Sequence, residues 1–229
     1  MRIGGVQPSS FIDFPGTVSA VIFTVGCNFR CPYCHNPELV FESPDHELSG
    51  EEVLSFLETR AGLLPAVTIT GGEPTMQQDL LPFMRKVKRL GFRLKLDTNG
   101  TNPEVLREAI KEKLLDYVAM DVKAPLSKYA RVVASAVNTR RIAESISILL
   151  EGAVEYEFRT TIVRSQLELA DLEIIGQEIR GAKRYFLQKF NPAKTLHPSF
   201  HNYFSYSPQE LQDAAQALRA YVQSCEVRS

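Results

Sequence analysis

Short apolar segments alternate with amphipathic segments along most of the chain. Apolar runs of strand length, rich in Val, Ile and Phe, predict six strands, at 18–26, 66–74, 93–100, 117–125, 155–163 and 184–190. Between and after them, apolar residues recur at spacings of three and four. This spacing predicts helices after residue 49, over 80–87, from 103, over 138–151, over 166–180 and over 208–224.

Three of these helices carry recognisable start signals. Ser49 and Ser207 are each followed three residues later by a glutamate, which is the capping-box pattern. Asn102 precedes Pro103, and this pair is typical of a cap followed by the first helical residue. The helix boundaries at these three places are therefore well defined by the sequence.

Six strand–helix pairs in succession predict an α/β fold with a parallel sheet and outer helices. Six pairs are too few for the full eight-unit barrel of roughly 250 residues. Two arrangements remain: an open doubly wound sheet, or an incomplete (β/α)6 TIM-like barrel. In both arrangements ligands gather at the carboxyl ends of the strands.

Composition narrows the class of protein. The chain has 229 residues, 44% hydrophobic and 23% charged, which is typical of one globular domain, with a core over about 16–190 and a C-terminal helix over about 208–224. A net charge of -1 gives no attraction to nucleic acid or to an anionic membrane. Without a secretory signal or an apolar run of roughly 20 residues, we expect a cytoplasmic protein with reduced thiols.

Polar side chains are unusually frequent on the predicted strands. Residues two apart on a strand share a face, and central parallel strands are normally apolar. One face of three adjacent strands nevertheless carries Lys95, Asp97, Asp121, Lys123, Glu157, Arg159 and Thr161. Because unpaired buried charge is costly, these residues either form ion pairs inside the barrel or face a ligand.

Three cysteines follow the first strand, in the sequence GCNFRCPYCHNP (26–37). Structural zinc normally takes four protein ligands, so Cys27, Cys31 and Cys34 would need a fourth, such as His35 or Cys225. A four-iron cluster held by three thiolates instead leaves one iron open to a ligand. The spacing favours the cluster, and zinc and an unliganded loop remain as alternatives.

The segment Cys27-Asn28-Phe29-Arg30-Cys31-Pro32-Tyr33-Cys34 resembles the signature of the radical S-adenosylmethionine superfamily. The longer stretch IDFPGTVSAVIFTVGCNFRCPYCHNPELV is similar to the opening of glycyl-radical-enzyme activating proteins, in particular activators of anaerobic ribonucleoside-triphosphate reductase. The resemblance extends from about residue 5 to residue 190. Of the two arrangements that the strand pattern allows, this resemblance leads us to predict the incomplete (β/α)6 barrel.

The resemblance implies the cofactors and their ligands. Cys27, Cys31 and Cys34 would hold a [4Fe-4S] cluster, and S-adenosylmethionine would bind the fourth iron. Tyr33 would lie beside the adenine. In the GGEP turn, Gly71 and Gly72 allow close backbone approach, and the carboxylate of Glu73 would accept from the methionine amino group.

Further roles are implied for the strands that follow. Asp121 and Lys123 would act in catalysis, with Lys123 facing the cofactor. Asp97, Thr98 and Asp121 would supply oxygens to a monovalent cation, with the Ala119 carbonyl as a weaker candidate. The remaining cofactor contacts implied are Asp97, Thr98, Asn99, Arg159 and, packing on adenine, Ile162.

The implied reaction is reductive cleavage of S-adenosylmethionine, followed by abstraction of a glycine hydrogen from a partner enzyme such as anaerobic ribonucleotide reductase. A flavodoxin or ferredoxin-type protein would supply the electron. Formate lyase is a doubtful partner, because 187–192 lacks the histidine typical of its activators. The alternatives are a small-molecule enzyme resembling 7-carboxy-7-deazaguanine synthase and a non-catalytic iron–sulfur or zinc protein.

Four residues are expected to lie outside the chemistry. His35 is predicted to shape the cysteine loop. His197 and His201 lie in a polar, aromatic segment and are predicted to be loop residues. Cys225 is expected on the last helix, without a role at the site.

Overall fold

The helices and strands follow the predicted alternation. The computed structural model describes residues 1–42 and 46–228. Its strands are β1 (Arg2–Phe14), β2 (Thr17–Thr24), β3 (Leu48–Ser49), β4 (Ala66–Gly71), β5 (Arg93–Thr98), β6 (Tyr117–Asp121), β7 (Glu155–Ile162), β8 (Tyr185–Lys189) and β9 (Cys225–Arg228). Its helices are α1 (Pro37–Val40), α2 (Gly50–Glu58), α3 (Leu80–Arg89), α4 (Pro103–Lys111), α5 (Tyr129–Val133), α6 (Thr139–Leu150), α7 (Leu169–Glu178) and α8 (Pro208–Leu218). Over these two ranges, no helix has the length and apolar character needed to cross a bilayer.

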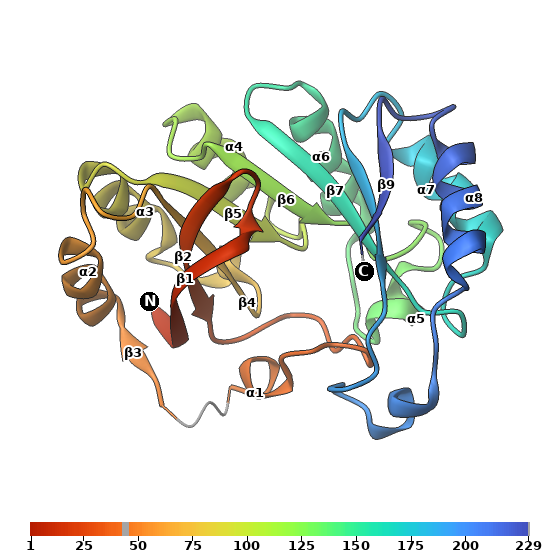
Figure 1. Cartoon of the computed structure of the whole chain (residues 1–229), viewed down its shortest axis with the longest axis horizontal. Coiled ribbons are helices and arrows are strands. Elements are labelled where there is room, and N and C mark those ends of the chain that lie inside the picture. Colours follow the sequence, from red (N-terminus) through yellow and green to blue (C-terminus); the bar gives the residue numbers. More distant parts are fainter. Residues whose placement is uncertain (43–45, 229) are drawn as a thin grey trace.

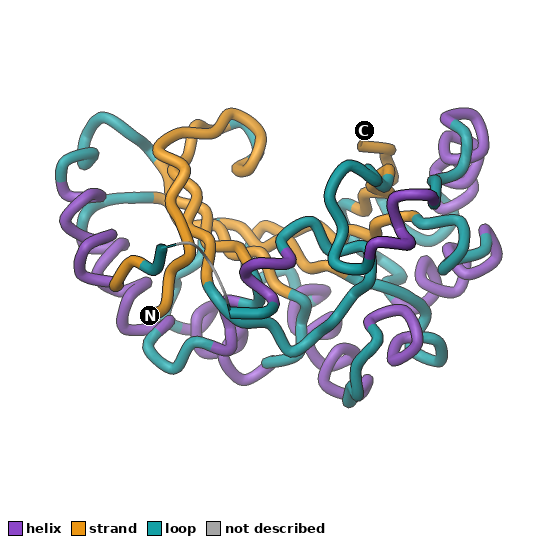
Figure 2. Tube along the Cα trace, turned by 90° about the horizontal axis from the view of Figure 1, so that it is seen from below, coloured by secondary structure: helices purple, strands orange, loops and turns teal. Residues whose placement is uncertain are grey.

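The strands form one sheet in the order β3-β1-β2-β4-β5-β6-β7-β8-β9. From β2 to β9 every neighbouring pair is parallel, whereas β1 runs antiparallel to both β2 and β3. The sheet curves, and most helices lie along one side of it (Figures 1 and 2). Because β3 and β9 are edges, the barrel does not close, and the predicted incomplete barrel is confirmed.

All three helices begin where the sequence signals place them, and at two of them the cap side chain makes its hydrogen bond. Both capping boxes form: Glu52 N donates to Ser49 Oγ (3.2 Å), and Glu210 N donates to Ser207 Oγ (3.2 Å). The side chain of Asn102 does not cap α4; it donates instead to Thr75 Oγ1 at 2.9 Å. The side-chain cap expected at Asn102 is therefore absent, because this side chain binds the loop residue Thr75 instead.

The core lies between the sheet and its helices. Strand side chains at alternate positions pack against the apolar faces of the helices and are fully buried: Ile22, Ile69, Leu96, Val118, Met120, Phe158 and Leu187. The opposite face of the same strands carries the polar residues noted above. Alternation therefore places apolar side chains on the face that packs against the helices and polar side chains on the concave face, where a ligand can bind.

Strand β1 was not predicted. Its sequence contains two glycines, a proline and two serines, and its pairing with β2 is interrupted by register shifts after Ile3, Gln7 and Ser10. A bulged strand lacks the strict alternation on which strand prediction rests. The two-residue strand β3 and the short helices α1 and α5 also lack a usable pattern.

The C-terminal end differs from the prediction. Helix α8 ends at Leu218, six residues earlier than expected, and Cys225 lies on β9 instead of a helix. Tyr221, Val222 and Cys225 continue the helical spacing, so the pattern alone does not mark the end. Backbone bonds to the loop before β8 redirect the chain: Gln223 N donates to the Ala182 carbonyl, and Gly181 N donates to that of Tyr221, both at 2.9 Å.

Strand β9 is anchored by one ion pair, and this gives a prediction for stability. Arg228 donates to both oxygens of the buried Glu157, at 2.6 and 2.9 Å. The Arg228→Ala variant leaves that carboxylate with only the Tyr117 hydroxyl (2.8 Å), so we expect a loss of about 1–3 kcal/mol in unfolding free energy. Urea denaturation measures it. Arg219→Ala, an exposed change directly after α8, should leave the midpoint unchanged. Equal midpoints for both variants would contradict this role.

Candidate active site

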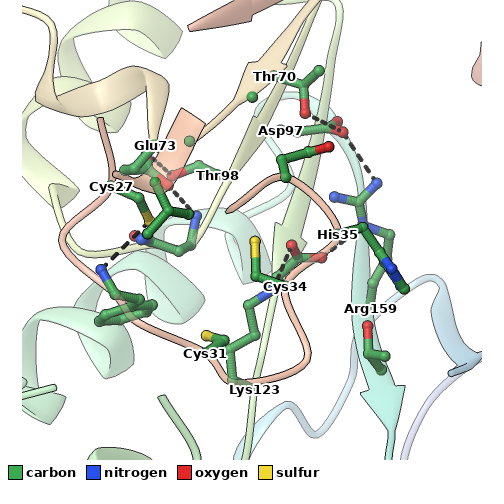
Figure 3. Close-up of a pocket in the computed structure, with 18 of the residues that line it drawn as sticks. Cys27, Cys31, Cys34, His35, Thr70, Glu73, Asp97, Thr98, Lys123 and Arg159 are labelled. Atoms are coloured by element: carbon green, nitrogen blue, oxygen red, sulfur yellow. Dashed lines mark hydrogen bonds and ion pairs between the residues drawn. The ribbon is translucent and has the colours of Figure 1, made fainter. Parts of the chain in front are cut away.

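One cavity of about 400 Å³ lies at the carboxyl ends of the strands and brings most predicted site residues together (Figure 3). Its volume is within the range of small-molecule sites. The predicted residues that line it are Cys27, Cys31, Tyr33, Cys34, Gly71, Gly72, Glu73, Asp97, Thr98, Asn99, Asp121, Lys123 and Arg159. Segments up to 130 residues apart in sequence thus share one wall, as strand-end placement predicts.

The three clustered thiols all face this cavity. Burial raises the pKa of Cys27 to about 12 and that of Cys31 to about 11. Across residues 1–42 and 46–228, no three His, Cys, Asp or Glu side chains converge closely enough to hold a single metal ion. Thiols spread around a shared space suit a cluster of several irons better than one tetrahedral zinc.

Among the other sulfur and imidazole candidates, His35 lines the cavity and the remaining three lie outside it. His35 is exposed and pairs with the Lys194 carbonyl through Nδ1 (2.8 Å), which agrees with a loop-shaping role. His197 precedes the short 3-10 helix Pro198–Asn202, and His201 lies within it. Neither histidine lines the cavity. Cys225 is buried on β9, also away from the cavity.

Glu73 joins two of the loops at the cavity. It is almost fully buried and accepts hydrogen bonds from Thr75 N (3.1 Å), Thr98 Oγ1 (2.8 Å) and Asn99 N (2.6 Å). Burial raises the pKa of its carboxyl, and these donors oppose the shift. The carboxylate therefore fixes the turns after β4 and β5 to each other while remaining on the cavity wall.

The two glycines before Glu73 are required by the fold itself. Gly71 has φ of +116°, and a Cβ there would lie 2.3 Å from Thr24 N. A Cβ on Gly72 would lie 2.0 Å from the Gly26 carbonyl oxygen. The close approach predicted for these glycines is thus made to the end of β2 and the start of the cysteine loop.

An amide pair connects the cysteine loop to the turn after β5. Asn99 Nδ2 donates to Asn28 Oδ1 (2.8 Å), and Asn28 Nδ2 donates to Thr101 Oγ1 (3.0 Å). Asn28 directly follows Cys27 in the sequence, so this pair holds the first cysteine's segment in place. The sequence offered no signal for Asn28, because an exposed loop asparagine has many ordinary uses.

Ion pairs occupy the concave face of the sheet. Arg159 lies between two carboxylates and donates to Asp97 (3.2 Å) and to Asp121 (2.8 Å). Lys95 pairs with Asp97, and Lys123 pairs with Asp121 at 2.9 Å. Three cationic side chains thus face two carboxylates. Of these cationic side chains, Lys123 and Arg159 line the cavity and offer charged donors to an anionic group of a ligand.

This network keeps its members ionised. Burial alone would raise the pKa of Asp121, but Arg159 and Lys123 more than offset it and hold that pKa at about 2. Asp97 is likewise held below its usual value by Arg159 and Lys95, against the effect of burial. Burial lowers the pKa of Lys123, but nearby Asp121 outweighs it and raises that pKa well above its usual value.

The residues predicted to bind a monovalent cation already have protein partners in this structure. The carboxylates of Asp97 and Asp121 are engaged by Arg159 and the two lysines. The third expected ligand, Thr98, directs its hydroxyl to Glu73. The sequence match identified the residues but not their partners, and the guanidinium already supplies the positive charge between the two carboxylates.

Two predicted adenine contacts have different outcomes. Tyr33 is buried at the cavity, its ring meets Phe190 edge-on (6.5 Å), and its hydroxyl has no hydrogen-bond partner among the described residues. Such an orphaned group suits a polar ligand. Ile162 is fully buried but does not line the cavity, since it alternates with cavity-lining Arg159 and Thr161 and faces the helices.

The cavity also includes residues that the prediction missed: Asp13, Phe23, Thr70, Thr161 and Gln188. Thr70 donates to Asp97 at 3.2 Å, and Thr161 donates to Gln188 at 3.4 Å. The last four sit at alternating inward positions of predicted strands, so alternation contained a signal for them. Asp13 belongs to β1, whose strand character was not predicted.

Taken together, the donor set fits the implied cofactors. Three thiols meet one wall of the cavity, which suits an iron–sulfur cluster with one open iron. A buried carboxylate, an unpartnered tyrosine hydroxyl and the cationic groups of Lys123 and Arg159 lie on the other walls. These groups match the ammonium, adenine and carboxylate of S-adenosylmethionine in chemical type.

Comparison with known proteins agrees with this site. Residues 21–165 match the family model of the radical SAM superfamily. A Methanocaldococcus jannaschii protein named as a glycyl-radical enzyme activating enzyme is 34% identical over 99% of this chain and 95% of its own length. A 7-carboxy-7-deazaguanine synthase of Thermococcus kodakarensis is 27% identical over 82% of this chain and 79% of its own.

Solved structures share the architecture. The crystal structure of Streptococcus suis SuiB with a precursor peptide superposes with a TM-score of 0.68 at 12% identity, covering 91% of this chain and 48% of that one. At that identity the likeness concerns the fold alone. The family match includes all three cavity-facing thiols, and members of the family use a [4Fe-4S] cluster and S-adenosylmethionine. This chain belongs to the radical SAM superfamily.

Proposed function

We propose that this chain is a glycyl-radical enzyme activating enzyme, which removes a hydrogen atom from a glycine of a partner protein. The observation that carries the proposal is the single cavity in which three thiols face the charged strand ends. Similarity to a named activating enzyme over nearly the full length of both chains supports it.

The cofactors supply the redox chemistry. Cys27, Cys31 and Cys34 would hold the cluster, which would supply the single electron needed for reductive cleavage of S-adenosylmethionine and, through it, for removal of the glycine hydrogen. The protein binds and orients the reactants. Glu73 offers a carboxylate to an ammonium, and Tyr33 offers its free hydroxyl. Arg159, fixed by two carboxylates, presents a cation of constant charge.

Within this function we propose anaerobic ribonucleotide reductase as the partner and a flavodoxin or ferredoxin-type protein as the electron donor. The resemblance of residues 12–40 to activators of that reductase supports the first. On β8 the cavity is lined by Gln188, and the segment 187–192 has no histidine, which argues against formate lyase. The proposal of a flavodoxin or ferredoxin-type donor follows from the need for one low-potential electron per turnover.

A second candidate is a reaction on a small molecule, favoured by the similarity to a 7-carboxy-7-deazaguanine synthase. Two observations weigh against it. The sheet is open along one side, which suits the entry of a segment of another protein. The full-length relative named as an activating enzyme also has the higher identity.

The test is anaerobic reconstitution followed by reduction with dithionite in the presence of S-adenosylmethionine. We expect 5′-deoxyadenosine, and, with purified anaerobic ribonucleotide reductase added, a glycyl-radical doublet in the electron paramagnetic resonance spectrum. Cleavage without a doublet on any glycyl-radical enzyme, combined with turnover of a small molecule, would favour the second candidate. No cleavage under strong reduction would refute both.

A further inference from the structure

The tip of the hairpin formed by β1 and β2 carries two exposed apolar side chains beside the cavity. We propose that Phe11 and Ile12 form the surface that holds the protein partner while its glycine segment enters the cavity. This inference rests on the proposed function, and it adds where the partner docks. Four features support this role: the exposure of the two side chains, the free edge of β1, the place of Asp13 on the cavity wall, and the charge of residues 4–16.

Phe11 and Ile12 are far more exposed than apolar side chains usually are. Their exposed fractions are 80% and 90%, whereas Ser10 and Phe14 on either side are buried. Two adjacent strand residues normally point to opposite faces; here a register shift between Ser10 and Phe14 turns both outward. Ser10 Oγ accepts from Ile12 N (3.3 Å) and pairs with Asp13, which stabilises this local bend.

The outer edge of β1 is free over most of its length. Strand β3 pairs with β1 only at Arg2 and Ile3, so within the described residues 4–14 have no strand on that side. A free edge offers backbone donors and acceptors to an extended segment of another protein. An apolar pair at the end of such an edge adds an anchor for side chains.

The hairpin is continuous with the cavity. Asp13, the residue after Ile12, lines the same cavity as the three cysteines. In Figure 2 the β1–β2 ribbon rises from the sheet on the side away from most helices, so the tip lies toward the concave face. Because Phe14 pairs with Thr17 at the start of β2, the tip lies toward the amino ends of the parallel strands. A partner held at Phe11 and Ile12 would therefore extend its segment past Asp13 and along the concave face to the cysteines.

Charge favours a protein over an anionic membrane at this surface. Residues 4–16 contain one acidic and no basic side chain, whereas surface-binding membrane segments rely on Lys and Arg. A small substrate would fit inside the cavity and would not need an apolar anchor outside it. The partner's complementary surface is expected to be apolar, without a cluster of acidic groups.

The test separates docking from chemistry. In the Phe11→Ser/Ile12→Ser double variant, the concentration of anaerobic ribonucleotide reductase that gives half-maximal glycyl radical should rise by about tenfold or more, because two buried anchors are lost. A synthetic peptide spanning the reductase's radical glycine enters the cavity without the hairpin, so its turnover should change by less than about twofold. Cluster content and reductive cleavage without a partner should be unchanged.

Leu63→Ser is the matched control, since Leu63 is 78% exposed on the loop after α2 and does not line the cavity. It should behave as the wild type. An unchanged half-maximal concentration in the double variant, or an equal effect on peptide and protein, would overturn the docking role. So would a change of oligomeric state with activation intact, which would assign the tip to self-association. A wild type that cleaves its cofactor but gives no doublet overturns the proposed function, and the docking role with it.

Discussion

Replacing Cys31 by alanine is expected to abolish the iron–sulfur cluster and all cleavage of S-adenosylmethionine. Cys31 is the most deeply buried of the three cavity-facing thiols, and no fourth cysteine lines the cavity to replace it. Two remaining thiols cannot retain a cluster that already leaves one iron open. Iron and sulfide analysis after anaerobic reconstitution should fall from about four of each per chain to near zero. Cys27→Ala and Cys34→Ala should behave alike.

Cys225 provides the control, because it is a buried cysteine of the same chain that lies on β9, outside the cavity. Cys225→Ala should keep full iron content and cofactor cleavage. Loss of iron in that variant would imply a ligand role that the structure does not show. Stoichiometric zinc in the wild type, with no uptake of iron, would contradict the assignment of the cluster.

The repeated part of the fold was predictable because its strands and helices have strict periods. All six predicted strands exist, and the two capping boxes form as expected. Strand β1 escaped because bulges break its alternation. Strand β9 escaped because the helical spacing through Tyr221 and Cys225 persists beyond the point where tertiary backbone bonds end the helix. Local patterns cannot contain information on such long-range bonds.

For the site, the sequence identified positions but not partners. Strand-end placement correctly brought Cys27, Glu73 and Asp121 into one cavity. It could not show that Arg159 would lie between two of the carboxylates predicted to bind a cation, and the cation site stays a prediction. It also could not place Asp13, because that depends on how an irregular edge strand bends.

Replacing Asp121 by asparagine is expected to keep the cluster and to lower the rate of cofactor cleavage by about 10- to 100-fold. The change retains the side chain's shape but removes the charge that positions Arg159 and Lys123, at 2.8 and 2.9 Å. A hydrogen bond to a charged group contributes about 1.5–3 kcal/mol, which corresponds to that range of rates. Iron analysis and the initial rate of 5′-deoxyadenosine formation give the two readouts.

The effect of this variant should not depend on pH in the neutral range. Burial disfavours the charged form of Asp121, but Arg159 and Lys123 lower its pKa to about 2, below the usual value of roughly 3.9. Its ion pairs therefore contribute fully above about pH 4 and are lost only as the pH falls through about 2. The rate ratio of wild type to variant should be constant between about pH 6 and 9, because the carboxylate stays ionised there. Asp116→Asn, which alters a carboxylate paired with Lys88 (2.7 Å) outside the cavity, should leave the rate unchanged. A ratio that varies with pH, or equal losses in both variants, would show that the Asp121 charge does not position the cationic pair during cleavage.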